Sequence, residues 1–406
     1  MRPAPAPRSP LLRQYLLVTG NYWAFTLTDG ALRMLVVLHF HQLGYTPLQV
    51  AMLFLFYEVF GVITNLVGGW LGARLGLNRT MNLGLGLQIG ALAMLAVPAA
   101  MLTVPWVMAA QALSGIAKDL NKMSAKGSLK LLVPTGEQAR LYRWVARLTG
   151  SKNALKGVGF FLGALLLSLL GFDGAVLAMA AALVLVWIGS LVFLRADLGK
   201  ATAKPKFRDL LSKSPAINRL SAARLFLFGA RDVWFVVALP VFLASQLGWR
   251  HAQIGGFLAL WIIGYGAVQA LAPAITGLRR GGRTPDGRAA FAWALPLALL
   301  PAGMALALAS GWAPGPVLVW GLLAFGALFA LNSALHSYLI LSYAREDGVS
   351  LDVGFYYMAN AGGRLLGTVL SGGVYQTAGL AACLWLSAAF IALAALVSLT
   401  LPRHTA

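Results

Sequence analysis

The stretch QLGYTPLQV, residues 42–50, returns in altered form as QLGWRHAQI, residues 246–254, so that the two copies begin 204 residues apart. A second pair repeats in the same order, because Gly115 with Leu120-Asn121 returns as Gly326 with Leu331-Asn332. Internal similarity on this scale indicates a chain built from two related halves.

Apolar runs long enough to cross a membrane fill both halves. The chain has 406 residues and is only 11% charged, and its mean hydropathy is +0.76. A transmembrane helix needs about 20 apolar residues. We therefore predict an all-α integral membrane protein with twelve transmembrane helices and no soluble domain. The spans are expected to begin near Leu16, Leu48, Met81, Val104, Trp144, Ala175, Leu220, Ile254, Ala289, Val317, Phe355 and Leu380.

A basic segment separates the two halves. It runs from Arg195 to Lys213 and includes Lys204 and Arg208. We predict an N-terminal six-helix half over 1–195, a cytoplasmic basic linker over 196–215 and a C-terminal six-helix half over 216–406. Two six-helix halves related by a parallel repeat are typical of the major facilitator fold, in which substrate binds near the middle of the membrane between the halves.

The formal charge of +20 is distributed by loop. Basic residues gather before the first span and in alternate loops, whereas the opposite loops carry only Arg250 among them. This pattern follows the positive-inside rule and predicts that both termini are cytoplasmic, with the lipid bilayer and not nucleic acid as the partner. The residues behind the prediction are Arg2, Arg8, Arg13, Arg74, Arg79, Arg279, Arg280, Arg283 and Arg288.

The sequence offers few residues that could form a metal site, a cofactor site or a catalytic site. Cys383 is the single cysteine, which excludes an internal disulfide and leaves too few thiolates for a thiolate metal site. Among five histidines, only His336 is expected at useful depth in the membrane. Because serine, histidine and acid do not recur at compatible depth, we predict no catalytic residues, no metal and no cofactor.

Lysines at four-residue spacing mark one helix of the first half. They are Lys118, Lys122, Lys126 and Lys130. A charged side chain at the bilayer centre costs at least about 2.5 kcal/mol, so it normally faces a cavity, a partner or a ligand. We expect Lys118 and Lys122 to line a cavity and Lys126 and Lys130 to lie at its cytoplasmic mouth, where snorkelling charges are the alternative.

The predicted spans hold more cations than acids. The cations are Arg33, Lys118, Lys122, Lys152, Lys156, Arg231 and Arg364, and the acids, which are candidates for ion pairing or proton coupling, are Asp29, Glu58, Asp119 and Asp232. Helical spacing predicts the pairs Asp29–Arg33 and Asp119–Lys122. Three positive charges remain, which indicates a small anionic substrate. Whether an acid exchanges a proton during transport stays open.

Uncharged polar residues supply further candidates for substrate binding. Asn21 and Tyr22 fall in the first span and Asn360 in the eleventh, where each could hydrogen-bond a ligand. Packing or anchoring at the membrane interface is the alternative for the aromatic side chain. We expect Lys118 and Lys122 in the first half, with Arg231 and Arg364 in the second, to clamp the substrate from both sides.

Several long runs along the chain combine charged and apolar residues. They are GNYWAFTLTDGALRMLVVLHFHQLGY (20–45), QALSGIAKDLNKMSAK (111–126), LTGSKNALKGVGFFLG (148–163), FLFGARDVWFVVALP (226–240) and YYMANAGGRLLG (356–367). These runs resemble the ArsJ family of organoarsenical efflux permeases, and the resemblance spans nearly the whole chain. The resemblance implies a bacterial inner-membrane exporter of 1-arseno-3-phosphoglycerate that confers arsenate resistance. It also implies a functional partner, the glyceraldehyde-3-phosphate dehydrogenase that makes this substrate.

Two other interpretations compete with arsenical export. The same fold could transport another organophosphate or organic anion, or the chain could be a membrane sensor or scaffold that transports nothing. Unpaired cations inside the membrane favour a transport pathway over the third interpretation.

Overall fold

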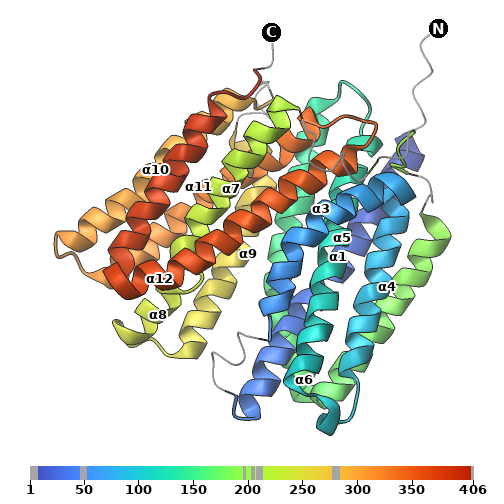
Figure 1. Ribbon diagram of the computed structural model, residues 1–406, viewed down its shortest axis with the longest axis horizontal. Helices are drawn as coiled ribbons and strands as arrows, with labels where there is room; N and C mark the ends of the chain where they lie inside the picture. Colours follow the sequence, from blue (N-terminus) through green and yellow to red (C-terminus); the bar gives the residue numbers. More distant parts are fainter. Residues whose placement is uncertain are drawn as a thin grey trace. The chain divides into compact units, whose positions relative to one another are not determined.

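The computed structural model describes residues 8–45, 53–194, 198–202, 206, 214–276 and 284–403. Leu48, most of the predicted linker with Lys204 and Arg208, and four of the nine basic loop residues (Arg2, Arg279, Arg280 and Arg283) lie outside the described residues. All regular secondary structure within the described residues is helical, as predicted (Figure 1).

The helices follow the predicted spans closely. They are α1 (Arg8–Gln42), α3 (Leu55–Leu75), α4 (Leu77–Leu95), a short 3-10 helix η1 (Ala99–Met101), α5 (Val104–Leu132), α6 (Gln138–Phe193), α7 (Pro215–Phe235), α8 (Ala238–Ser245), α9 (His251–Ile275), α10 (Gly287–Ala309), α11 (Pro314–Tyr343) and α12 (Val349–Ser398). Side chains fix some of the starts. Ser214 caps α7 by accepting a hydrogen bond from Ile217 N, and Asp286 caps α10 by accepting from Arg288 N.

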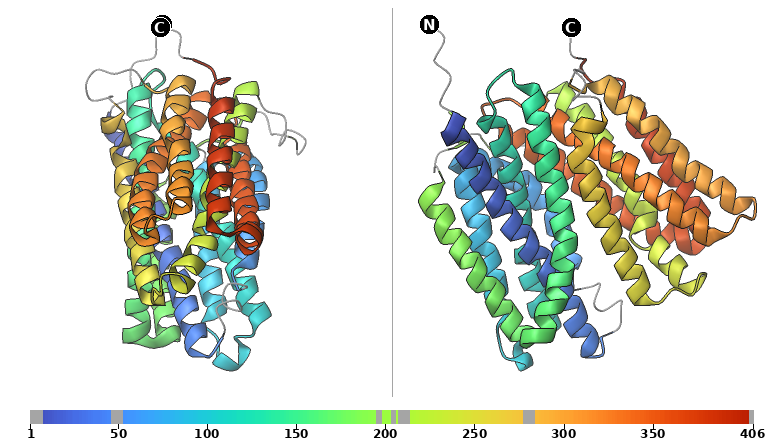
Figure 2. Two further views of the ribbon diagram at one scale, coloured as in Figure 1. Left: turned by 90° about the vertical axis from the view of Figure 1, so that its left-hand side faces the viewer. Right: turned by 180° about the vertical axis from the view of Figure 1, so that it is seen from behind.

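Two helices are far too long for one crossing. α6 has 56 residues and α12 has 50, which at a rise of 1.5 Å per residue gives about 84 and 75 Å, against a hydrocarbon core of about 30 Å. Each is broken once, at Gly171 (φ 68°, ψ −175°) and at Gly379 (φ 76°, ψ −176°). This backbone region is essentially restricted to glycine. In the right-hand view of Figure 2 the two parts of α6 (green) turn back on each other.

Each of these breaks therefore separates two predicted spans. The break at Gly171 lies between the spans predicted to start at Trp144 and Ala175, and Gly379 directly precedes the start predicted at Leu380. Within the described residues, six helical stretches meet the length and hydropathy needed to cross a membrane, and α6 and α12 are among them. With α6 and α12 counted twice and α7 joined to α8, the helices provide the twelve predicted crossings.

The chain forms two compact units, each described here by itself. The first comprises Met1–Trp144, Val158–Leu210 and Arg345–Gly354, and the second comprises Val145–Gly157, Leu211–Ala344 and Phe355–Ala406. Most of α6 belongs to the first unit, but its residues 145–157 belong to the second. Most of α12 belongs to the second unit, but its residues 349–354 belong to the first. The predicted boundaries at 195 and 216 stay a prediction.

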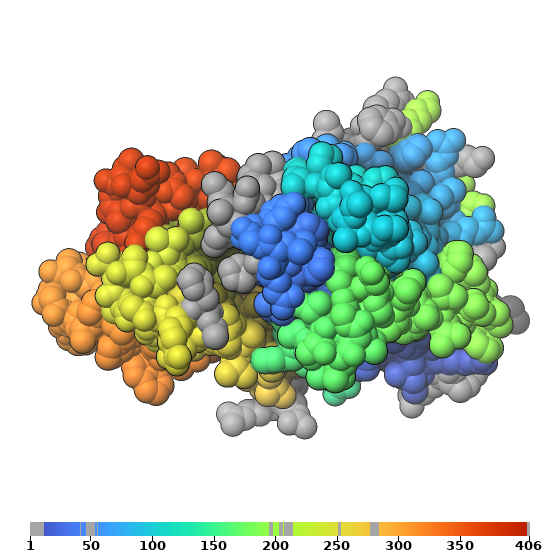
Figure 3. Space-filling view, turned by 90° about the horizontal axis from the view of Figure 1, so that it is seen from below, coloured from blue at the N-terminus to red at the C-terminus, as the bar shows by residue number. Residues whose placement is uncertain are grey.

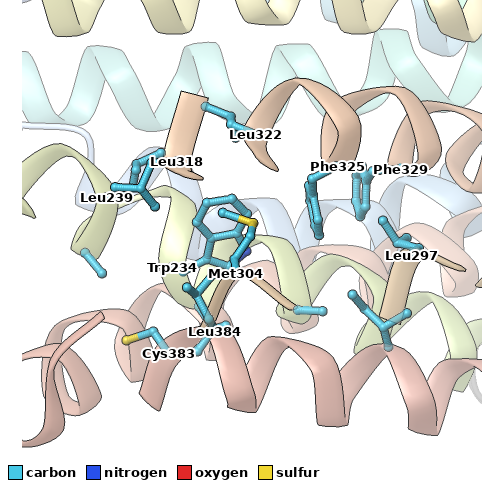
Figure 4. Packing of buried hydrophobic residues seen from close by; sticks show 14 of the residues in the cluster. Trp234, Leu239, Leu297, Met304, Leu318, Leu322, Phe325, Phe329, Cys383 and Leu384 are labelled. Carbon is cyan, nitrogen blue, oxygen red and sulfur yellow. The ribbon is translucent and has the colours of Figure 1, made fainter. Parts of the chain in front are cut away.

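Each unit has its own apolar core. In the first unit, Phe25, Leu35, Leu85 and Leu92 are buried with residues of α5 and of the second part of α6. In the second unit Trp234 is fully buried, and Figure 4 shows it among Leu239, Met304, Leu318, Leu322 and Leu384. On the face seen in Figure 3, the chain around α8 and the start of α9 (yellow) borders segments of α12 (red) and of α10 and α11 (orange).

The repeat found in the sequence recurs as a local geometry. Asn121 of α5 and Asn332 of α11 are both fully buried. Each donates from Nδ2 to a carbonyl four residues earlier, Ala117 O in one unit and Leu328 O in the other, and both distances are 3.0 Å. Equivalent helices of the two units therefore carry the same side-chain bond.

Candidate functional site

In the first unit, one buried carboxylate holds two of the predicted lysines. Asp119 Oδ1 lies 2.6 Å from Lys122 Nζ, and its Oδ2 lies 3.8 Å from Lys118 Nζ. The Asp119 side chain is 2% exposed, whereas the two lysine side chains keep 18% and 16% of their surface. The predicted pair Asp119–Lys122 is confirmed. Lys126, which we expected at the mouth of the cavity, is only 3% exposed and so is not a snorkelling surface charge.

Tyr57 of α3, which the sequence analysis missed, joins three helices at this place. Its hydroxyl donates to Asp29 Oδ1 of α1 at 2.7 Å. Its ring centroid lies 3.7 Å from Lys118 Nζ of α5 and 4.7 Å from Arg33 Cζ of α1. A cation over an aromatic face is stabilised by the ring quadrupole. Tyr57 directly precedes Glu58, one of the predicted acids, and this position in the sequence could have identified it as a candidate site residue.

The predicted pair Asp29–Arg33 is wrong. Arg33 Nη2 instead binds Glu58 Oε1 at 3.2 Å, while Asp29 accepts from Tyr57. The physical reason is packing of α3 against α1, because α3 offers a carboxylate to the half-exposed Arg33 and a phenol to the buried Asp29. We call Asp29, Arg33, Tyr57, Glu58, Lys118, Asp119 and Lys122 the first cluster. It contains three cations and three acids.

A phenylalanine at Tyr57 is expected to destabilise the protein by about 1–3 kcal/mol. It keeps the ring that faces Lys118 but leaves the buried Asp29 carboxylate without its hydrogen-bond donor, and a buried unsatisfied acceptor has a cost of this size. Thermal unfolding in detergent measures it. The matched change is Tyr375→Phe, because within the described residues the Tyr375 hydroxyl makes no hydrogen bond. Equal losses of stability in both variants would contradict the assignment.

In the second unit, Asp232 of α7 binds two predicted arginines. Its Oδ1 lies 2.6 Å from Arg231 Nε, and its Oδ2 lies 3.2 Å from Arg364 Nε of α12. The Asp232 side chain is fully buried. A Cβ on Gly367 of α12 would lie only 3.0 Å from Asp232 Cβ, so the missing side chain at Gly367 lets the two helices approach closely enough for this bridge.

The sequence analysis also missed Arg224, which lies two helical turns before Arg231 in α7. It is 2% exposed, and its Nε donates to Asn360 Oδ1 at 2.8 Å. Arg224 and Arg231 both lie against the Phe228 ring, with their guanidinium carbons 3.8 and 5.0 Å from the ring centroid. The spacing 224, 228 and 231 is that of one helix face, which was a usable signal. We call Arg224, Arg231, Asp232, Asn360 and Arg364 the second cluster. It holds three cations and one acid.

The remaining predicted residues lie in other surroundings. Lys152 Nζ donates to Asn153 Oδ1, and Asn153 in turn donates to Gln269 of α9 at 2.6 Å, so this part of α6 is bound to α9. Lys156, one turn later, is half-buried. Asn21 donates to Ser190 Oγ at 2.8 Å and so uses its amide to hold α6. Tyr22 is 2% exposed. Substrate contact by these four residues stays a prediction.

Histidine and cysteine show no metal chemistry in the part of the chain that the structure describes. His336 and Cys383 are both buried, and within the described residues no group of three or more histidine, cysteine, aspartate or glutamate side chains is placed to hold a metal ion.

Several known proteins are similar to this chain. The human organic anion transporter MFSD10 (TETRAN) has a crystal structure with 19% identity and a TM-score of 0.76, over 96% of this chain and 99% of that one. The E. coli fucose:proton symporter FucP gives 15% identity and a TM-score of 0.75, over 97% and 99%. A bacterial homologue of the iron transporter ferroportin, in an outward-facing state, gives 15% and 0.72, over 97% and 98%. No curated protein sequence gave a significant match.

At these identities the structural likeness concerns the fold alone, and the family is established by sequence. The sequence model described as Major Facilitator Superfamily matches residues 16–351, which is most of the chain. That match agrees with the twelve crossings, the repeated halves and the charged clusters inside an apolar helical bundle. The chain therefore belongs to the major facilitator superfamily and is a multi-pass membrane transporter.

Proposed function

We propose that this transporter exports a small organic oxyanion, and that its substrate is 1-arseno-3-phosphoglycerate. The observation that carries the proposal is the second cluster, which holds three arginines and one acid: Asp232 binds Arg231 and Arg364, and Arg224 binds the neutral Asn360. Arginine presents a planar fork of donors that suits carboxylate, phosphate and arsenate groups. The resemblance to organoarsenical permeases supports the particular substrate, and the lone buried Cys383 fits a pentavalent oxyanion better than trivalent arsenic.

Export of such an anion is also energetically favourable. Moving a charge of about −3 outward across a membrane that is negative inside gains about 7 kcal/mol per 100 mV. We place the protein in the bacterial inner membrane with both termini cytoplasmic, where a glyceraldehyde-3-phosphate dehydrogenase supplies the substrate. Proton coupling through Asp29 or Glu58 is a separate question that the charge balance leaves open.

Another organic anion is the second candidate substrate. The human protein with a similar fold is described as an organic anion transporter. The two candidates differ in their dependence on the dehydrogenase, because only the arsenylated compound has to be made from arsenate.

Uptake of labelled arsenate into everted membrane vesicles tests the proposal. Accumulation is expected only when the dehydrogenase, its cofactor and glyceraldehyde 3-phosphate are all present. Accumulation of arsenate without the enzyme would contradict the arsenylated substrate, and so would uptake restricted to other organophosphates. The second of these results would keep the broader anion transporter.

Glutamine at Lys118 or at Arg364 is expected to abolish this transport while the protein still reaches the membrane. Each change removes one cation of a cluster without adding bulk. Arg219→Gln is the matched control, because Arg219 is an exposed cation that donates to Thr400 O at 2.8 Å. Wild-type uptake by either cluster variant, at equal expression, would contradict the participation of that residue.

A further inference from the structure

Arg224 is the most deeply buried cation of the second cluster, and it differs from its neighbours in its pairing. Arg231 and Arg364 share Asp232, whereas Arg224 forms no ion pair within the described residues. A buried charge without a counter-charge is unfavourable, so such groups are normally paired or face a ligand.

The hydrogen bonds of Arg224 leave donors unused. Its Nε is taken by Asn360 Oδ1, and its Nη1 makes only long contacts of 3.4 Å to Ser333 O and Oγ. Within the described residues, neither Nη2 of Arg224 nor Nδ2 of Asn360 donates a hydrogen bond, and neither nitrogen is closed off from solvent. Each of these NH2 groups has two N–H bonds, so up to four donors remain at one place.

The position of these donors separates them from the arginine pair on Asp232. Arg224 and Arg231 are seven residues apart on α7, which is about 10 Å along the helix. Both guanidinium groups lie against the Phe228 ring, but each has its own partner, Asn360 for Arg224 and Asp232 for Arg231. One small anion cannot use both sets of donors in full, but a short molecule with an anionic group at each end can.

We propose that Arg224 and Asn360 form a second oxyanion subsite, and that the substrate therefore carries two separate oxyanion groups. One group binds at Arg231 and Arg364, and the other accepts hydrogen bonds from Arg224 Nη2 and Asn360 Nδ2. This proposal rests on the transport function proposed above and names its substrate class as small organic anions with phosphate, arsenate or carboxylate groups at both ends.

Binding of two matched probes to the purified full-length protein in nanodiscs tests the subsite. Glycerol 3-phosphate carries one oxyanion group, and 3-phosphoglycerate carries a second one on a carbon chain of the same length. Wild-type protein is expected to bind 3-phosphoglycerate about 30-fold more tightly, the ratio that about 2 kcal/mol for a buried charged contact gives at 1.4 kcal/mol per tenfold. Arg224→Gln is expected to bring this ratio close to one, and Arg219→Gln is expected to keep it.

The variant Asn360→Asp tests whether the subsite can be lost while the protein stays folded. Because Asn360 Oδ1 already accepts from Arg224 Nε, an aspartate of the same shape would neutralise Arg224 from within the protein. This variant is expected to be at least as thermally stable as wild type and yet to lose the preference for 3-phosphoglycerate.

The possible results distinguish the subsite from the function on which it rests. A 30-fold preference that survives both Arg224→Gln and Asn360→Asp would overturn the second subsite, as would equal affinity of wild-type protein for the two probes. Failure of wild-type protein to bind any anion, inorganic phosphate included, would instead contradict the proposed function and the subsite together.

Discussion

Alanine at Gly363 is expected to destabilise the protein by about 3 kcal/mol or more, whereas alanine at the adjacent Gly362 is expected to be neutral or slightly stabilising. A Cβ on Gly363 would overlap the carbonyl oxygen of Leu225 in α7 and lie 2.8 and 2.9 Å from its carbonyl carbon and Cα. These are backbone atoms that cannot rotate away, so the cost falls at the upper end of the range for overpacking.

Gly362 gives a control in the same helical turn. A Cβ there would meet no atom within 4 Å. Alanine is favoured over glycine in a helix interior by about 1 kcal/mol, so the change at this position carries no packing penalty. Thermal unfolding and size-exclusion profiles in detergent measure both variants. Equal stability of the two would contradict the close contact of α7 and α12.

This contact also determines the geometry of the second cluster. Leu225 follows Arg224, and Gly363 precedes Arg364, so the two helices approach closely beside two arginines of the second cluster. Any shift that relieves the overlap at Gly363 would change the distance of Arg364 from Asp232. The Gly363 variant is therefore expected to lose transport even where some folded protein remains.

The sequence predicted the fold well because its signals are local. Apolar length and the loop charges depend on neighbouring residues alone, and the predicted start at Val104 coincides with the start of α5. The breaks at Gly171 and Gly379 fell between predicted spans for the same reason, since glycine is nearly the only residue that adopts their backbone angles.

The site was predicted less completely because its partners come from different helices. Spacing along one helix identified Asp119–Lys122 correctly, but it also suggested Asp29–Arg33, and it contains no information about Tyr57 arriving from α3. Arg224 was missed because the sequence placed it close to the membrane surface. It lies four residues after the predicted span start at Leu220, where arginines commonly reach the interface, whereas α7 begins at Pro215 and buries it.

Replacing Asp232 by asparagine is expected to produce a protein that is unstable alone and is strongly stabilised by anions. The change keeps the side-chain shape but removes the fully buried carboxylate that Arg231 and Arg364 both bind. Breaking a buried pair by removing one partner costs about 3–5 kcal/mol. Because the Arg364 side chain is 34% exposed and is screened by solvent, we expect the lower end, about 3 kcal/mol.

Anions should reverse this loss because they supply the missing charge. A ligand that binds only the folded state stabilises it by RT ln(1 + [L]/Kd), so a tighter Kd raises the unfolding temperature further at the same concentration. In the proposed mode of binding, the Asp232 carboxylate of wild-type protein competes with the ligand for Arg231 and Arg364, and the asparagine of the variant does not. Phosphate and 3-phosphoglycerate are therefore expected to raise the unfolding temperature of Asp232→Asn more than that of wild type.

The control is the same substitution at Asp286, an acid of the second unit outside the cluster. Asp286 caps α10 through bonds to Arg288 N and Ala289 N, and asparagine caps helices about as well as aspartate. Asp286→Asn should therefore keep both the stability and the anion response of wild type. An anion response of Asp232→Asn no larger than that of wild type would show that Asp232 stabilises the fold without competing for the ligand. A larger response with slower transport is expected instead, because an anion that meets no competition from Asp232 would leave Arg231 and Arg364 more slowly.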